Sequence, residues 1–209
     1  MKKIVTVILD PAHGKDVAGK RSPDGKHLEY VWSRMISDMI EEGLVKLGYQ
    51  VEWTTKSENE IGLTKRKENA NNIVANKGNI KLLLSNHNNA AGNGDRWLNA
   101  RGCEIWTSKG KTLSDLFADE LFRGLHTQFP EGGPIKYRYG DPASGNKDKD
   151  ENFTVLMGNY YACLIEWLFQ DNEDDVKMLR DPICNQKYVK AIIQGVEYIN
   201  DYVTSKLNK

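Results

Sequence analysis

Short apolar runs alternate along this chain with longer segments whose apolar residues recur every three or four positions. Residues 3–9 form an apolar run rich in β-branched side chains, which is typical of a buried strand. In residues 28–47 the apolar spacing predicts a helix with one apolar face, and Gly48 is the kind of residue that ends a helix. The apolar positions of this predicted helix are Val31, Met35, Ile36, Met39, Ile40, Leu44 and Leu47.

The same two patterns continue to the end of the chain. The further predicted strands are residues 50–54, 80–84, 103–107, 154–157 and 162–167. The further predicted helices are residues 61–77, 113–129 and 185–203. Strands that alternate with helices predict an α/β layer fold with a largely parallel sheet. Because no internal repeat or linker divides the pattern, we expect a single domain over residues 1–209. Functional sites of such folds lie beyond the carboxyl ends of the strands.

Two stretches, residues 88–102 and 130–152, lack both patterns and are rich in glycine, asparagine and charge. Structureless segments as long as the second are uncommon in compact domains unless they are functional or mobile. Both stretches carry aromatic and arginine side chains, which suit sugar faces and peptide carboxylates, although ordinary packing is an alternative. These residues are Trp97, Arg101, Tyr137, Arg138 and Tyr139.

Composition and charge exclude several classes of protein. The chain has 209 residues, with 29 Lys and Arg against 29 Asp and Glu, so it lacks the charge excess of a strongly basic nucleic-acid binder. No apolar run approaches the roughly 18 residues of a membrane span. The apolar run after Lys3 ends at Asp10 and is shorter than the roughly 7–15 residues that a signal peptide needs. We therefore expect no nucleic-acid partner, no membrane insertion, no signal peptide and a cytoplasmic location.

Two of the four histidines stand just after predicted strands. His13 follows the first predicted strand and His87 follows the third, so both would project from carboxyl ends of the sheet toward one cleft. Imidazole nitrogens are good zinc ligands, and Glu29, at the start of the first long helix, is a candidate for a third. Taken one at a time, each histidine could instead be a hydrogen-bonded loop residue, and Glu29 a carboxylate that suits a helix N-terminus.

Glu166 stands at the end of the most apolar run in the chain. A carboxylate is costly to bury there unless it is paired or lies beside a metal. One interpretation is a buried ion pair. The other is a glutamate next to a metal-bound water, where it would act as general base and then as general acid. Two histidines, a ligand glutamate and a separate glutamate are the parts of zinc-assisted amide hydrolysis.

The order of motifs along the chain resembles the zinc-dependent N-acetylmuramoyl-L-alanine amidases of the type 3 amidase family. That family shows DPxHGG after a strand, a glutamate opening the first helix, an LxxRxxxAN helix, an SxHxN segment and a final strand ending in glutamate. Here the matching residues are Asp10-Pro11-Ala12-His13-Gly14, Glu29, Leu63 to Asn71 with Arg66, Ser85 to Ala90 with His87, and Leu164-Ile165-Glu166.

The resemblance implies that His13, Glu29 and His87 bind one zinc ion and that Glu166 is the catalytic carboxylate. It implies a three-layer fold, with a twisted, mostly parallel sheet of about six strands covered by helices on both faces. It also implies a peptidoglycan substrate, cut between N-acetylmuramic acid and L-alanine.

The sequence departs from the family pattern at a few positions. Lys15 replaces the second glycine of DPxHGG, Asn88 replaces an alanine, and Trp167-Leu168 replaces the usual Gly-Phe. None of these departures removes a predicted ligand, but they leave substrate detail open. For Arg66, a structural salt bridge is the expected role.

Together these features suggest a phage or prophage endolysin, held in the host cytoplasm before it reaches the cell wall. Because the catalytic fold uses nearly the whole chain, we expect no separate wall-binding domain. The alternatives are a zinc peptidase or deacetylase that acts on wall fragments, and a non-catalytic wall-binding module of the same fold. The sequence leaves the target bacterium, the phage or bacterial origin and the oligomeric state open.

Overall fold

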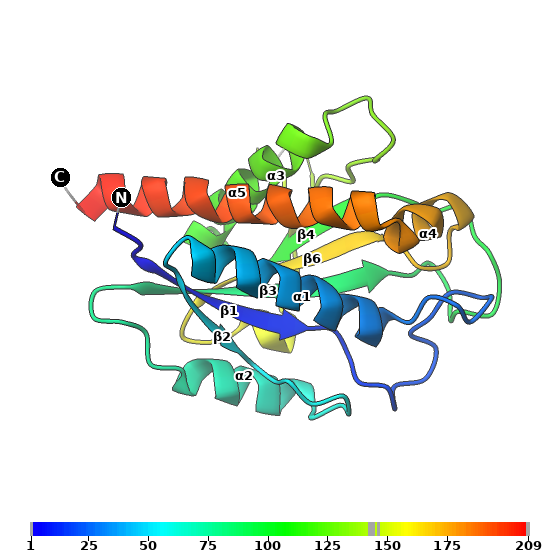
Figure 1. The fold of residues 1–209 in the computed structure, drawn as a ribbon, viewed down its shortest axis with the longest axis horizontal. Helices are drawn as coiled ribbons and strands as arrows, with labels where there is room; N and C mark the ends of the chain where they lie inside the picture. Colours follow the sequence, from blue (N-terminus) through cyan, green and yellow to red (C-terminus); the bar gives the residue numbers. More distant parts are fainter. Residues whose placement is uncertain (1, 142–144, 146, 208–209) are drawn as a thin grey trace.

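The six-stranded sheet of this protein has the strand order β2-β1-β3-β6-β4-β5 (Figure 1). The computed structural model describes residues 2–141, 145 and 147–207. The strands are β1 (Val5–Pro11), β2 (Gln50–Trp53), β3 (Ile80–Asn89), β4 (Cys103–Thr107), β5 (Lys149–Asp150) and β6 (Tyr161–Phe169). Neighbouring strands run parallel except for β4 and β6, which are antiparallel. The predicted α/β fold with a mostly parallel sheet is therefore confirmed.

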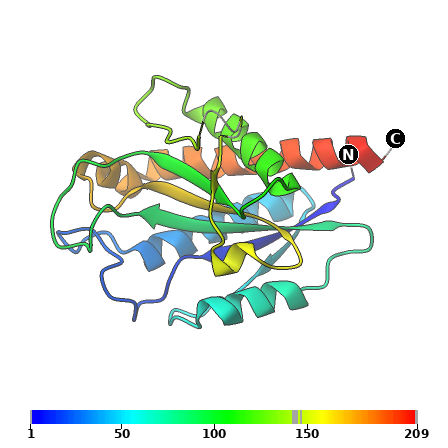
Figure 2. The same cartoon turned by 180° about the vertical axis from the view of Figure 1, so that it is seen from behind.

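Helices cover both faces of this sheet, in three layers (Figures 1 and 2). The helices are α1 (Glu29–Lys46), α2 (Leu63–Asn72), α3 (Leu113–Gln128), α4 (Glu173–Arg180) and α5 (Pro182–Leu207), with a short 3-10 turn, η2 (Thr154–Leu156). Side chains alternate between the two faces along each strand. In β1, Val7 packs in the core under α1, α3 and α5, whereas Ile8 packs with Leu83 and Leu164 under α2 and η2.

The helices α3 and α5 cross at very close range. A Cβ added to Gly124 of α3 would lie 2.3 Å from the carbonyl oxygen of Ala191, and Gly195 of α5 lies directly opposite. Only hydrogen fits at Gly124, so this glycine sets how closely the two helices pack.

Several elements differ from the sequence-based prediction. The strand β3 continues to Asn89, so His87 lies inside it rather than after it. Its polar end stays in the sheet because β1 and β6 flank it on both sides. The segment 154–157, predicted as a strand, instead contains the turn η2 over Thr154–Leu156, and the edge strand β5 comes earlier. The helix α2 ends at Asn72 rather than at residue 77, and Val74 beyond it is 84% exposed.

The predicted helix 28–47 is α1, but its apolar face is wider than the part that packs on the sheet. Val31, Met35 and Leu47 are exposed, whereas Ile36, Ile40 and Leu44 are buried. Among the helices that the structure describes, none has the length and apolar character needed to cross a membrane. Of the long loop at 130–152, residues 142–144 and 146 lie outside the described residues.

Candidate active site

Three predicted site residues from separate elements meet at the carboxyl ends of β1 and β3. His13 follows β1, Glu29 is the first residue of α1, and His87 is near the end of β3. The Oε1 atom of Glu29 lies 3.2 Å from Nδ1 of His87 and 3.7 Å from Nε2 of His13. One ligand atom from each residue lies within 4.8 Å of the other two. The side chains of His13, Glu29 and His87 therefore converge, as the sequence-based reasoning expects.

Glu29 is fully buried and is held from two sides. Its Oε1 accepts a hydrogen bond from the Asn88 backbone N–H at 3.0 Å, and its Oε2 accepts one from the Gln170 amide at 2.9 Å. No lysine or arginine among the described residues pairs with it. Burial by itself would raise the pKa of Glu29, but the hydrogen bond and charge of His87 and the charge of His13 hold it at about 2. Glu29 is therefore an ionised carboxylate facing two imidazoles.

The two histidines of the cluster have opposite electrostatic environments. Burial lowers the pKa of His13 to about 4, so this imidazole is neutral near pH 7. Burial acts the same way on His87, but its hydrogen bond to Glu29 and the charge of Glu166 outweigh it and raise the pKa of His87. Glu29 and Glu166 thus both favour positive charge at His87. A divalent cation bound there would supply that charge, since metal ligands must be deprotonated.

Glu166 lies beside this cluster on the neighbouring strand. It is the register partner of His87 across β3 and β6, so the two side chains point to the same face of the sheet. Its Oε2 atom is buried and has no hydrogen-bond partner among the described residues. Burial raises the pKa of Glu166 to about 7; His87 opposes this shift and Glu29 adds to it. A carboxyl group with that pKa can both accept and donate a proton near neutral pH.

A buried arginine donates hydrogen bonds to the backbone around His13. Arg66 of α2 donates to Asp10 at 3.0 Å, to Glu60 at 2.9 Å and to the carbonyl oxygen of Pro11. It also donates to the carbonyl oxygen of His13, at 3.2 Å. The expected structural salt bridge of Arg66 is confirmed, and Arg66 also binds the backbone of His13, a predicted metal ligand.

The row of register partners that crosses the sheet through His87 and Glu166 continues to β4. Glu104 is the register partner of Glu166, and it pairs with Arg138 and with Lys149. Tyr137 and Tyr139 stack on each other and pack against Phe122 of α3, as the packing alternative expects. Of these three residues of the long loop, Arg138 is the one that joins the row of the predicted site.

Sequence reasoning did not single out Gln170 or Asn88 as residues that hold Glu29. Gln170 follows the apolar strand β6 directly, and a polar residue in that place was the available signal. Asn88 was noted only as a departure from the family motif. His27, two residues before Glu29, lies 2.7 Å from the Asn88 side chain through its Nε2 atom. His27 therefore supports Asn88 rather than joining the cluster.

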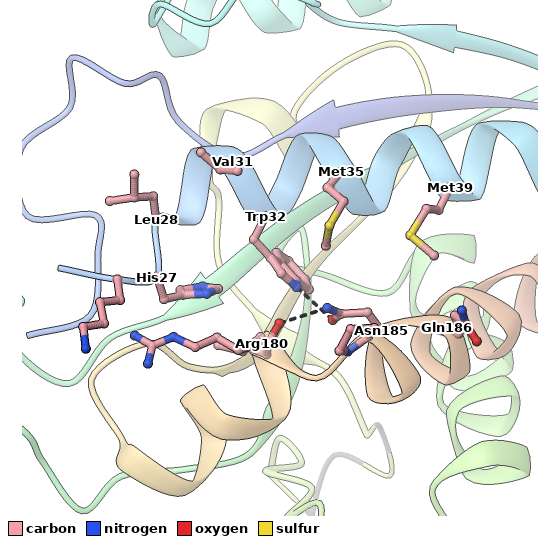
Figure 3. Close-up of a pocket in the computed structure, with 12 residues that line it drawn as sticks. His27, Leu28, Val31, Trp32, Met35, Met39, Arg180, Asn185 and Gln186 are labelled. Atoms are coloured by element: carbon pink, nitrogen blue, oxygen red, sulfur yellow. Dashed lines mark hydrogen bonds between the residues drawn. The ribbon is translucent and has the colours of Figure 1, made fainter. Parts of the chain in front are cut away.

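An apolar pocket of about 360 Å³ lies between α1 and the start of α5 (Figure 3). The exposed side chains Val31 and Met35 line it, together with Met39 and Trp32, and Trp32 donates to Asn185 at 3.1 Å. None of the four predicted site residues lines this pocket. It accounts for the wide apolar face of α1 but is separate from the cluster.

Comparison with known proteins agrees with the site. Residues 7–198 match the sequence model of a family described as N-acetylmuramoyl-L-alanine amidase. Among solved structures, the N-acetylmuramoyl-L-alanine amidase from Clostridium difficile 630 is 25% identical, with a TM-score of 0.76 and coverage of 96% of this chain and 98% of that chain. The CwlD amidase from Clostridioides difficile, in complex with the GerS lipoprotein, is 23% identical, with a TM-score of 0.77 and coverage of 98% and 100%.

A more distant likeness shows the fold alone. The catalytic domain of the CD27L endolysin, which targets Clostridia difficile, is 18% identical, with a TM-score of 0.62 and coverage of 93% of this chain and 97% of that chain. No curated protein sequence matches this chain. The family match extends over residues 7–198 and agrees with the order of the motifs. This chain therefore belongs to the type 3 family of N-acetylmuramoyl-L-alanine amidases.

Proposed function

We propose that this protein is a zinc-dependent peptidoglycan hydrolase that cleaves the amide bond between N-acetylmuramic acid and L-alanine. The family match and the structural neighbours support N-acetylmuramoyl-L-alanine amidase activity on peptidoglycan. The observation that carries the zinc-dependent mechanism is the cluster of His13, Glu29 and His87. Beside it lies a buried oxygen of Glu166 for which the described part of the chain offers no hydrogen-bond partner.

The donor set fits zinc in chemistry, and the two distances that involve Glu29 fit it in spacing. Two imidazoles and one carboxylate are ligands that catalytic zinc sites use, with a fourth position left for water or substrate. Ligand atoms about 2.1 Å from a tetrahedral ion lie about 3.4 Å from one another. The distances from Glu29 to His87 and to His13 are 3.2 Å and 3.7 Å. When bound, zinc would polarise the scissile carbonyl and make a water molecule more acidic.

Glu166 would move the proton in this reaction. It would take a proton from the water that attacks the carbonyl carbon of the lactyl group. It would then donate that proton to the alanine nitrogen as the C–N bond breaks. The products are a lactyl carboxylate and a free alanine amine. Asn88 and Gln170 would keep Glu29 oriented throughout, because each of its oxygens accepts a fixed hydrogen bond.

The test is a turbidity assay on purified walls, with metal analysis of the protein. The wild-type chain should clear walls, lose this activity in chelator and regain it with zinc. Glu166→Gln should keep its zinc but lose at least about a hundredfold in rate. As a matched control, Glu104→Gln removes the neighbouring carboxylate of the same row and should keep most of the activity. A Glu166→Gln protein that still released alanine-headed peptides would contradict the mechanism.

Mass spectrometry of the digest separates the alternatives. An amidase leaves free L-alanine amino termini on intact stem peptides, whereas a peptidase shortens the stems and a deacetylase changes only the sugars. A wall-binding module would bind walls without clearing them. The endolysin role stays a prediction, because the likeness to the CD27L domain concerns the fold alone.

A further inference from the structure

Arg34 of α1 directs all of its N–H groups at backbone carbonyl oxygens. A guanidinium has five donors in a rigid, planar fork. Here Nε and Nη2 both donate to the Ser57 carbonyl, at 3.1 and 2.6 Å. Nη1 donates to the carbonyls of Ala12 and Tyr30, at 3.1 and 3.0 Å. Nη2 also donates to the His13 carbonyl, at 2.8 Å. No carboxylate forms an ion pair with Arg34 within the described part of the chain. A charged side chain without a counter-ion is thus devoted to positioning backbone.

The carbonyl groups that Arg34 binds belong to three segments. Ala12 and His13 lie in the loop after β1, Tyr30 is in the first turn of α1, and Ser57 is in the loop after β2. The two loops also contact each other directly. The Lys15 N–H donates to the Glu58 carbonyl at 2.8 Å, the Glu60 N–H donates to the Asp16 carboxylate at 2.8 Å, and Lys15 pairs with the Glu58 carboxylate at 3.3 Å. Arg34 is the point where all three segments meet.

His13 needs such support because its backbone is in the left-handed region, with φ of 46°. A residue with a side chain holds that conformation only where its surroundings fix it. The Ala12 carbonyl belongs to the peptide unit before the His13 Cα, and the His13 carbonyl to the unit after it. Arg34 binds both oxygens, so it fixes the two peptide planes that set φ and ψ of His13. Arg66 contributes a second bond to the His13 carbonyl.

We propose that Arg34 is a positioning residue that aims the His13 imidazole at Glu29 and His87. This proposal rests on the proposed metal site, since it concerns how one ligand of that site is oriented. The fork of arginine is required, because a lysine ammonium is a point charge and cannot span the carbonyls of Ala12, His13 and Ser57 together. A simple role in holding loops together would lower stability without a specific effect on metal affinity.

The test measures zinc affinity by chelator competition, together with the melting temperature of the metal-free protein. Residues that orient a metal ligand typically change metal affinity by about 10–100-fold when replaced. We expect losses of that size in Arg34→Met and in Arg34→Lys, which keeps the charge and the aliphatic stem. The matched control is Arg101→Met. Arg101 also ties a loop, through the Pro134 carbonyl and Asp175, but has no contact with His13. This control should bind zinc within about twofold of the wild type.

The outcomes separate the two proposals. If the wild type binds zinc and both Arg34 variants bind it equally well, the role of Arg34 is wrong and the metal site stands. If the wild type binds no zinc, the metal site itself is wrong, and the role of Arg34 with it. If Arg101→Met loses as much affinity as Arg34→Met at an equal loss of melting temperature, general destabilisation is the cause and the proposal is overturned. Should Arg34→Met not fold, Arg34→Lys gives the same comparison.

Discussion

Replacing Arg66 by methionine should destabilise the protein strongly, because Arg66 is the counter-charge of a buried carboxylate. The side chains of Arg66 and Asp10 are 2% and 1% exposed, and their charged atoms lie 3.0 Å apart. In Arg66→Met, Asp10 would keep its hydrogen bonds from the hydroxyl groups of Thr54 and Ser85 but would lose its positive partner. The carboxylate would then be buried and uncompensated.

The expected size follows from what such pairs cost when one partner is removed. Breaking a buried ion pair destabilises a protein by roughly 3–5 kcal/mol. For a chain of this size, each kcal/mol shifts the melting temperature by about 2–4 °C, so the expected decrease is roughly 6–20 °C. Glu60 would also lose its partner, but it lies nearer the surface and adds little.

Urea denaturation of four proteins measures this effect: the wild type, Arg66→Met, Asp10→Asn and the double variant. The double variant should be more stable than Arg66→Met alone, because the unpaired charge is gone. Arg123→Met is the matched control, since Arg123 makes an exposed pair with Glu120 and should change stability by less than about 1 kcal/mol. A loss below about 1 kcal/mol in Arg66→Met, or a double variant no more stable than Arg66→Met alone, would refute the reasoning.

Three further predictions concern stability. The pKa of Glu166 is raised from 4.5 to about 7 in the folded protein, so the proton on this group stabilises the fold fully below pH 4.5, and the effect is lost as the pH rises through 7. In urea titrations, the free energy of unfolding of metal-free Glu166→Gln should therefore increase relative to that of the wild type between pH 5 and pH 8. Leu168 has φ of 61°, a left-handed conformation that costs a non-glycine residue about 1–2 kcal/mol. The Leu168→Gly protein should therefore be more stable than the Leu168→Ala protein, and the opposite order would contradict this strain. Gly124→Ala should lower the melting temperature despite the better helix propensity of alanine, because its Cβ would lie 2.3 Å from the Ala191 carbonyl; an unchanged temperature would show that the helices can separate freely.

Local patterns were sufficient for the main elements of the fold. Apolar periodicity located β1, α1, α3 and α5, because those residues bury one face whatever lies opposite. The positions of His13 and Glu29 also followed from local order, since each stands directly after or at the start of an element. Parallel strands present their carboxyl ends at one edge, so the sequence by itself indicated that His13 and His87 lie near one another.

Only the tertiary structure decided the features that depend on distant partners. The polar end of β3 is a strand because β1 and β6 hydrogen-bond to it from both sides, and no pattern within residues 85–89 reports those neighbours. Gln170 meets Glu29 across 141 positions of sequence, and Arg34 reaches the carbonyls of two loops. Hydrogen bonds of this kind join groups that are far apart in the chain, and local patterns do not report them. The sequence by itself therefore determined the main elements of the fold and the chemical groups that are present. Packing determined how those groups are aimed.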